Sequence, residues 1–282
     1  MVSIKGLTQT VVSALVAAPA MSAPTELAVN TTSKHSTPFA MAFQHPTNNQ
    51  LAPTRFGLLL FPSITAIDAF GPLEFLALHS MGHYLNLSVI AQTLDPVSSK
   101  PRAMNAAGSS FGTTLVPTHT FANPPALDVL IIPGGIGTRA PDLDPAIAYV
   151  KATYPSLQYL ITVCTGAGIA ARAGVLDGKF ATTNKRAWAE TTGLRKEVKW
   201  VGKARWIADG NVWTASGVAA GMDLMNAFMG YVWGEALAKI ISDGMEYTPS
   251  RDPRVDPYAE LNNVTSVYDE MVGANGRVVG GV

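Results

Sequence analysis

Charge and cysteine are both scarce in this chain of 282 residues. Only 14% of the residues are charged, and 20 basic residues balance 20 acidic ones. Lysines and arginines form no run, which argues against nucleic acid or an anionic membrane surface as a partner. The single cysteine, Cys164, excludes an intramolecular disulfide. No apolar run of about 18 residues lies within the body of the chain, so no membrane-spanning helix is expected there.

Histidine is also poorly placed for catalysis, because all five histidines precede Cys164. His79 and His83 have the spacing of a zinc pair, but Met81-Gly82 should end the helix between them, so no metal site is predicted. Residues 135–140 mimic a dinucleotide fingerprint, yet Pro141 interrupts the helix that should follow. No cofactor is therefore expected.

The first 53 residues contain little that predicts a fold. Residues 1–23 run from one lysine through a largely apolar stretch to the small residues of AAPAMSA, an order that resembles a secretory signal. The alternative is an unfolded leader on a cytosolic protein, so the localisation stays open between these two. Residues 24–53 are rich in Ser, Thr, Asn and Pro and predict a flexible polar tether. One domain is expected over residues 54–262, followed by a surface tail over residues 263–282.

Within that domain, apolar runs alternate with helical patterns. RFGLLLFP, ALDVLIIPGG and QYLITVC are continuous apolar runs, typical of strands buried on both faces of a sheet. Helical segments separate them, and residues 217–241 predict one long helix. The expected fold class is α/β: a three-layer flavodoxin-like sandwich whose mainly parallel sheet carries helices on both faces.

Cys164 stands where the run QYLITV gives way to small residues and a helix. This strand–turn–helix order is typical of a nucleophile elbow. A thiol at a helix N-terminus should have a lowered pKa, although a lone cysteine is often only a small buried hydrophobe. Asp68, just past the first strand, is the acid best placed to exchange a proton with Cys164, unless it serves only as a helix N-cap.

Other candidate residues follow the strands at the same edge of the sheet. Gly134 and Gly135 could direct backbone N–H groups at a developing anion. Thr165 should hydrogen-bond near the thiol. Ile136, Phe70 and Trp188 are candidate walls of a substrate pocket, although such residues are more often core.

These motifs together resemble the ThiJ/PfpI superfamily, the class I glutamine amidotransferase-like fold, and most closely its isonitrile hydratase branch. The resemblance extends from about Arg55 to Ala259 and includes FGLLLFPSITAIDAFGPLEFL, TVCTGAGIAARAGVLDGKFATTNKRAW and ADGNVWTASGVAAGMDL. It implies that Cys164 is the nucleophile, that Asp68 pairs with it, and that Thr165, Gly134, Gly135 and Gly217 belong to the site. It also implies a homodimer and a small-molecule substrate.

The chain departs from that branch at two places. Asn184 stands where these hydratases usually have histidine, and Ala215-Ser216 where they have glycines. These departures affect the substrate more than the mechanism. Peptidase members place histidine directly after the cysteine, and glutaminase members need one downstream, so both activities are disfavoured here.

Three functions remain. The leading one is a cofactor-free hydratase, a lyase that converts an isonitrile and water to an N-substituted formamide. The second is a glyoxalase-like conversion of an α-oxoaldehyde through a hemithioacetal on Cys164. The third is a non-catalytic member in which an oxidisable cysteine senses redox state or a ligand.

Overall fold

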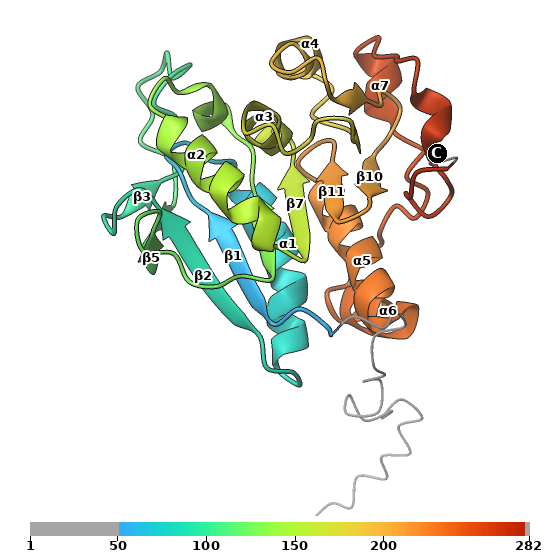
Figure 1. Ribbon diagram of the computed structural model, residues 1–282, viewed down its shortest axis with the longest axis horizontal. Coiled ribbons are helices and arrows are strands. Elements are labelled where there is room, and N and C mark those ends of the chain that lie inside the picture. Colours follow the sequence, from blue (N-terminus) through green and yellow to red (C-terminus); the bar gives the residue numbers. More distant parts are fainter. Residues whose placement is uncertain (1–50, 280–282) are drawn as a thin grey trace, which may run out of the picture. The chain divides into compact units, whose positions relative to one another are not determined.

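The computed structural model describes residues 51–279, and the predicted leader and nearly all of the tether lie outside the described residues. A seven-stranded sheet with the order β10-β11-β7-β6-β1-β2-β5 forms its centre (Figure 1). All neighbours in this sheet are parallel except β10 and β11. The strands are β1 (Arg55–Leu59), β2 (Asn86–Ala91), β5 (His119–Thr120), β6 (Val129–Ile132), β7 (Tyr159–Val163), β10 (Trp206–Asp209) and β11 (Val212–Ala215).

Helices cover both faces of this sheet. Helices α2 and α3 pack together on one face, whereas α1, α5 and α6 form a second layer on the other (Figure 1). The predicted three-layer α/β sandwich is therefore confirmed. The helices are α1 (Ala66–Ser80), α2 (Asp144–Thr153), α3 (Gly166–Arg172), α4 (Trp188–Thr192), α5 (Ala220–Trp233), α6 (Glu235–Gly244) and α7 (Pro257–Leu261), with 3-10 turns η2 (Ile136–Arg139), η3 (Tyr154–Ser156) and η4 (Asp269–Met271).

Strands β1, β6 and β7 are buried on both faces, as their continuous apolar runs predict. The helix expected over residues 217–241 is instead two helices. Gly234, with φ +99°, ends α5 and begins α6, a backbone conformation that residues other than glycine rarely adopt. Among residues 51–279, no helix has both the length and the apolarity needed to cross a membrane.

Two short two-stranded sheets accompany the main one. They are formed by β3 (Val97–Ser98) with β4 (Thr114–Leu115) and by β8 (Phe180–Ala181) with β9 (Lys199–Trp200).

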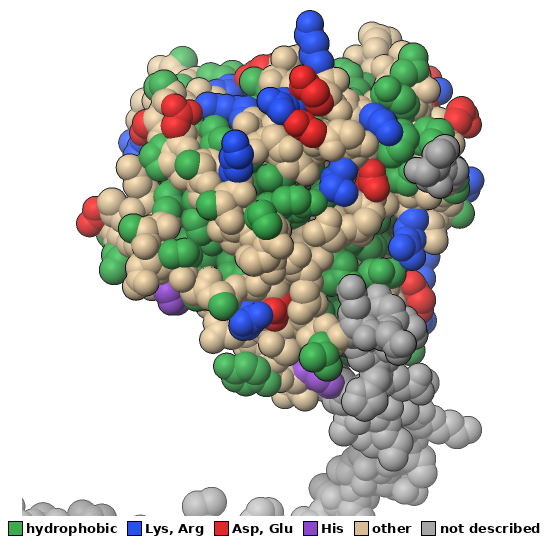
Figure 2. Space-filling view, viewed as in Figure 1, with side chains coloured by type: hydrophobic (Ala, Val, Ile, Leu, Met, Phe, Trp, Pro, Cys, Tyr) green, Lys and Arg blue, Asp and Glu red, His purple; other side chains and the backbone are tan. Residues whose placement is uncertain are grey.

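The stretch after α6 is packed onto the domain. Val272 is buried in a second small apolar cluster beside β8 and β10, and Arg277 forms a bridge to Ala208 of β10. On the visible face, lysines and arginines are interspersed with acidic residues, as the balanced composition suggests (Figure 2).

Candidate active site

Cys164 sits on a tight turn between β7 and α3. Its φ of +59° lies in the left-handed region, which is unfavourable for a residue with a side chain. The main chain is held on both sides: Cys164 N–H donates to the Ala215 carbonyl (3.1 Å), and Thr183 Oγ1 donates to the Cys164 carbonyl (2.9 Å). The predicted nucleophile elbow is present in this geometry, at the carboxyl end of β7.

Two glycines allow the turn to pack this closely. A Cβ on Gly166 would lie 2.3 Å from the Ile132 carbonyl oxygen, and a Cβ on Gly134 would lie 2.6 Å from the Thr165 nitrogen. Neither contact is tolerable, so the elbow and the turn after β6 can approach only without side chains at these positions.

Asp68, the acid that the sequence favours as the partner of Cys164, lies beside the thiol. It is in the first turn of α1 and is completely buried, but the N-cap of that helix is Thr65, so Asp68 is not the cap. Its Oδ2 accepts a hydrogen bond from Gly134 N–H (2.9 Å), and its carboxyl group also hydrogen-bonds Cys164. Its Oδ1 has no hydrogen-bond partner among the described residues. Burial raises the pKa of Asp68 to about 7, although both hydrogen bonds oppose the shift.

The thiol is neutral at ordinary pH. Burial, with a smaller contribution from the Asp68 charge, raises the pKa of Cys164 to about 12. Hydrogen bonds from Thr165 and Asn184 act in the opposite direction but are outweighed. The lowered pKa expected for a cysteine at a helix N-terminus is therefore wrong for this structure, because loss of hydration dominates over local donors. A protonated thiol thus contacts a carboxyl group that titrates near neutral pH.

Thr165 ties the elbow to the glycine turn. Its Oγ1 accepts from Gly135 N–H (3.0 Å) and donates to the Gly135 carbonyl (3.2 Å), while its own N–H hydrogen-bonds Cys164. The N–H groups of Gly134 and Gly135 are thus bound to Asp68 and Thr165. The expectation that these amides face a substrate oxygen is not met in this arrangement, where they position the two side chains next to the thiol.

Asn184 is a site residue that the sequence marked only as a departure from a pattern. Its side chain hydrogen-bonds Cys164, and its Oδ1 accepts from Ala187 N–H at 3.1 Å. Because the oxygen is occupied there, the Nδ2 group is the donor that faces sulfur.

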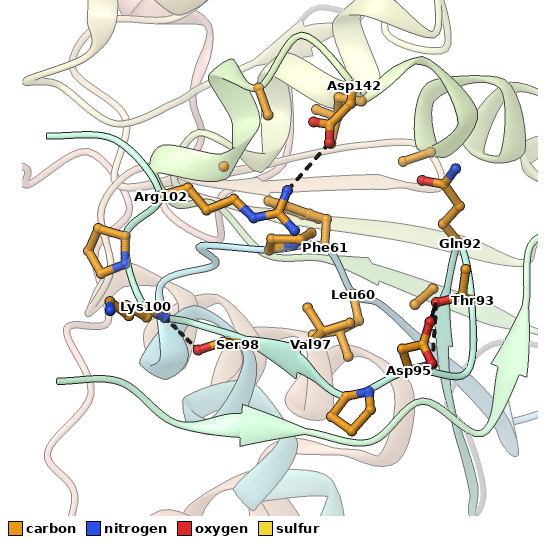
Figure 3. Close-up of a pocket in the computed structure, with 18 of the residues that line it drawn as sticks. Leu60, Phe61, Gln92, Thr93, Asp95, Val97, Ser98, Lys100, Arg102 and Asp142 are labelled. Atoms are coloured by element: carbon orange, nitrogen blue, oxygen red, sulfur yellow. Dashed lines mark hydrogen bonds and ion pairs between the residues drawn. The ribbon is translucent and has the colours of Figure 1, made fainter. Parts of the chain in front are cut away.

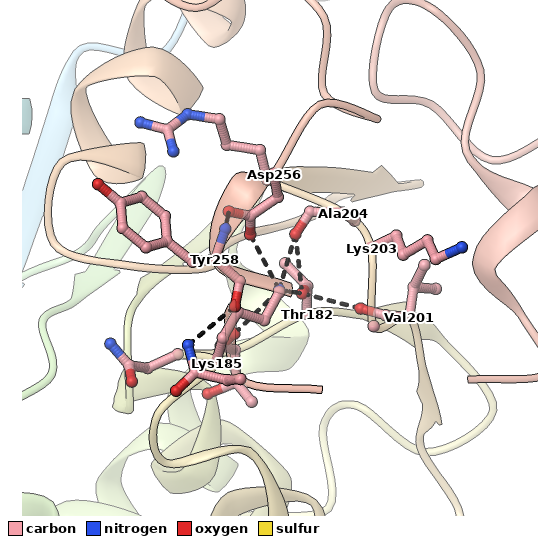
Figure 4. A network of polar contacts seen from close by, with 12 residues as sticks. Thr182, Lys185, Val201, Lys203, Ala204, Asp256 and Tyr258 are labelled. Atoms are coloured by element: carbon pink, nitrogen blue, oxygen red, sulfur yellow. Dashed lines mark hydrogen bonds and ion pairs between the residues drawn. The ribbon is translucent and has the colours of Figure 1, made fainter. Parts of the chain in front are cut away.

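Lys185, the next residue, anchors the loop that carries Asn184. Its ammonium group donates to Thr182 Oγ1 (2.7 Å) and the Ala204 carbonyl (2.8 Å) and lies 3.4 Å from Asp256 Oδ2 (Figure 4). The side chains of Lys185 and Asp256 are 2% and 0% exposed. Burial lowers the pKa of Lys185 to about 8, opposed by Asp256. This buried pair joins the C-terminal segment to the loop beside the thiol.

The remaining predicted residues divide into two groups. Gly217 lines a cavity of about 270 Å³ together with Asn184 and Ser216. Ile136 begins the turn that follows Gly135 and is half-buried. Phe70 is 46% exposed on α1, and Trp188 packs edge-on against Trp200 with ring centroids 6.3 Å apart. These two aromatic residues do not wall the cavity.

A larger cavity of about 690 Å³ lies beyond the carboxyl ends of β1 and β2 and does not include Cys164 or Asp68 (Figure 3). Arg102 and Asp142 form an ion pair of 3.4 Å on its lining. His79 and His83 stack at the C-terminal end of α1, with ring centroids 4.6 Å apart. Across residues 51–279, no cluster of three His, Cys, Asp or Glu side chains is arranged to hold a metal ion.

Comparison with known proteins agrees with this geometry. The model of the DJ-1/PfpI family matches residues 56–230, which include the elbow, Asp68 and the glycine turn. The chain belongs to the DJ-1/PfpI family. It is 30% identical over 217 residues to the isonitrile hydratase of Pseudomonas putida, covering 77% of this chain and 87% of that protein.

Other similar proteins include a transcriptional regulator and two solved structures. The transcriptional regulator GbdR of Pseudomonas aeruginosa is 29% identical over 146 residues, which cover 51% of this chain and 39% of the regulator. A ThiJ/PfpI protein from Pseudomonas syringae superposes with a TM-score of 0.59 at 28% identity, covering 76% of this chain and 84% of its own. Drosophila melanogaster DJ-1beta, at 14% identity, a TM-score of 0.55 and coverage of 69% and 98%, shares the fold. The family thus includes enzymes and regulators.

Proposed function

We propose that this protein is a cysteine-dependent hydratase that adds water to an isonitrile and releases an N-substituted formamide. The observation that supports it best is the contact between Cys164 and Asp68, in which a neutral thiol meets a buried carboxyl with a pKa raised to about 7. The 30% identity to an isonitrile hydratase supports the same substrate class.

The first step joins sulfur to the terminal isonitrile carbon. Asp68 accepts the thiol proton as the C–S bond forms and delivers that proton to the same carbon, giving a thioimidate, R–N=CH–S–Cys164. Because the thiol is the proton source, the addition needs no external acid. The donors from Thr165 and Asn184 stabilise negative charge on sulfur while the proton is on Asp68.

The second step releases the product. Water adds to the thioimidate carbon, with one of its protons passing through Asp68 to nitrogen, and gives R–NH–CH(OH)–S–Cys164. Loss of the C–S bond then forms R–NH–CHO and returns a proton to sulfur. The unpartnered Asp68 Oδ1 suits this relay, since it is a second oxygen that can receive a proton while Oδ2 stays bound to Gly134.

Two features disfavour the alternatives. A redox-sensing cysteine needs thiolate character and access to oxidant, whereas Cys164 is 6% exposed and its pKa is raised. The glyoxalase reaction would use the same two residues, but glyoxalases of this superfamily usually have a glutamate at the acidic position and often a histidine nearby. This chain has Asp68 at that position and no histidine after Cys164.

The test uses purified protein lacking residues 1–50, with wild type and Cys164→Ala side by side. Each is incubated with an aromatic and an alicyclic isonitrile, and formamide is followed by mass spectrometry, with methylglyoxal as a parallel substrate. Formamide from wild type alone supports the hydratase. Since one proton must reside on the Cys164–Asp68 pair, kcat/KM should fall below about pH 7 as Asp68 becomes protonated. Lactate without formamide would contradict the proposal.

A further inference from the structure

The cavity beside Asn184 has a lining unlike that of an ordinary apolar pocket. Its volume is about 270 Å³, and Asn184 connects it to the thiol, because the same side chain lines the cavity and hydrogen-bonds Cys164. Ser216, the second position at which the sequence departs from the hydratase pattern, also lines it. Asn184 and Ser216 therefore line the same small space, and the Asn184 side chain links that space to the nucleophile.

Ser216 offers an unused hydrogen-bonding group there. The residue is 1% exposed, and its N–H donates to the Arg205 carbonyl at 2.8 Å. Among residues 51–279, nothing hydrogen-bonds its hydroxyl group. The Ser216 hydroxyl is therefore free to donate a hydrogen bond to a ligand or a water molecule in the cavity that this residue lines.

The N-terminus of α5 faces the same space. The helix has 14 residues, its N-cap is Ala219, and no side chain caps it. The N–H groups of Val218, Ala219 and Ala220 have no acceptor within the described part of the chain, and all three residues line the cavity. Free N–H groups at the positive end of a helix dipole favour an anion.

The charges around the cavity are also one-sided. Lys185, Arg186 and Arg205 line it, and no acidic residue does. Two of these cations are compensated from behind, Lys185 by Asp256 at 3.4 Å and Arg205 by Asp223 at 2.6 Å. Arg186, which is exposed, has no carboxylate partner among the described residues. One positive charge is therefore left for a ligand.

We infer that this cavity binds a carboxylate on the substrate, so that the enzyme acts on isonitriles carrying a carboxylate substituent. The carboxylate accepts hydrogen bonds from Ser216 Oγ, from the first N–H groups of α5 and from Arg186. The thin, linear isonitrile group then extends past Asn184 to Cys164. This inference rests on the proposed function for the reacting group, but the anion site itself depends only on the cavity.

The first test compares para-isocyanobenzoate with para-isocyanobenzamide, which has nearly the same shape and no charge. Wild type should favour the carboxylate in kcat/KM by about tenfold or more. Ser216→Ala and Arg186→Gln should each lower this preference about threefold to tenfold, mainly through KM for the carboxylate, and added salt should weaken the Arg186 contribution. Arg102→Gln, a matched loss of charge at the other cavity, should keep the preference. Equal use of both substrates by wild type, or a preference unmoved by both variants, would overturn the inference.

A binding experiment tests this inference separately from the proposed reaction. Para-cyanobenzoate resembles the isonitrile in shape, and its affinity for Cys164→Ala can be measured by calorimetry without turnover. Binding that weakens about tenfold when Arg186→Gln is added supports the anion site even if no isonitrile is hydrated. No binding, or binding equal to that of the neutral para-cyanobenzamide, overturns it whether or not isonitriles are hydrated.

Discussion

Asp68 and Asp256 are both buried carboxyl groups, but they lie in opposite electrostatic surroundings. Asp256 faces the Lys185 ammonium group and also accepts from Tyr258 N–H at the start of α7. Asp68 faces the Cys164 thiol and the Gly134 N–H, and no lysine or arginine within residues 51–279 forms an ion pair with it. Burial without a counter-ion raises the pKa of Asp68 to about 7.

In the proposed mechanism, this difference separates an acid that relays protons from one that is structural. A carboxyl that holds its proton near neutral pH can both accept and return one, which is the property a proton relay requires. A carboxylate paired with a buried ammonium group is a poor proton relay. Because breaking such a pair leaves an uncompensated buried charge, the pair acts as a tether that holds its two segments together. In the proposed mechanism, aspartate thus serves two purposes in one chain, and the difference is whether a lysine lies opposite the carboxyl group.

The largest expected effect is the loss of catalysis in Asp68→Asn. Asparagine keeps the shape and can still accept from Gly134 N–H, but it cannot carry the thiol proton. Formamide production should fall by about 10²–10⁴-fold. The matched variant is Asp256→Asn, which should lose mainly stability, since it leaves the Lys185 charge uncompensated. Initial rates normalised to the folded fraction measure the contrast, and equal loss in the two variants would remove the distinction between relay and tether.

Lys185→Met should have the next largest effect, on folding rather than on chemistry. It leaves the Asp256 charge buried without its partner, and breaking such a pair costs about 3–5 kcal/mol of unfolding free energy. Urea unfolding followed by circular dichroism measures the loss. The double variant Lys185→Met/Asp256→Leu should regain much of it, because no charge is then buried. If Lys185→Met were as stable as wild type, the Lys185–Asp256 pair would contribute nothing to the free energy of unfolding.

The cost of keeping Asp68 uncompensated should appear in the pH dependence of stability. Its folded pKa is about 7, above the ordinary 3.8, so between these values the folded state binds the extra proton and stability falls as pH rises. The full loss is at most about 4 kcal/mol. Wild type should therefore lose more stability than Asp68→Asn between about pH 4 and 7, as measured by urea unfolding. If the unfolding free energies of the two proteins changed in parallel with pH, the pKa of the Asp68 carboxyl group would not be raised in the folded state.

Much of this comparison begins in the sequence. The apolar run before Cys164 predicts a buried strand, the small residues after it predict the sharp turn, and the position of Asp68 just past the first strand predicts that it lies at the same edge of the sheet. These features are local, so each is readable from a few neighbouring residues. The resemblance to a known family adds the pairing of the two.

The features that the sequence does not predict depend on contacts between residues distant in the chain. Asp256 lies in a Pro/Asp-rich stretch without periodicity, and nothing local indicates that it folds back onto Lys185. The direction of the Cys164 pKa shift follows from how completely the surrounding segments exclude water, which the sequence does not reveal. The sequence predicts that Gly134 and Gly135 donate to an anion, but their N–H groups are bound by side chains that only the tertiary structure brings near.

A third carboxyl, on the surface, should give the smallest effect. Asp252 accepts from Arg254 Nε (2.9 Å) and its second nitrogen (2.8 Å), and these bonds lower the pKa of Asp252 to about 2. The two side chains are 38% and 54% exposed, so water and salt screen the pair in both folded and unfolded states. Arg254→Gln should therefore raise the Asp252 pKa, followed by NMR titration, while the urea midpoint stays within error of wild type. If the midpoint fell as far as in Lys185→Met, burial would not be what makes an ion pair a tether, and the contrast between Asp68 and Asp256 would need a different cause.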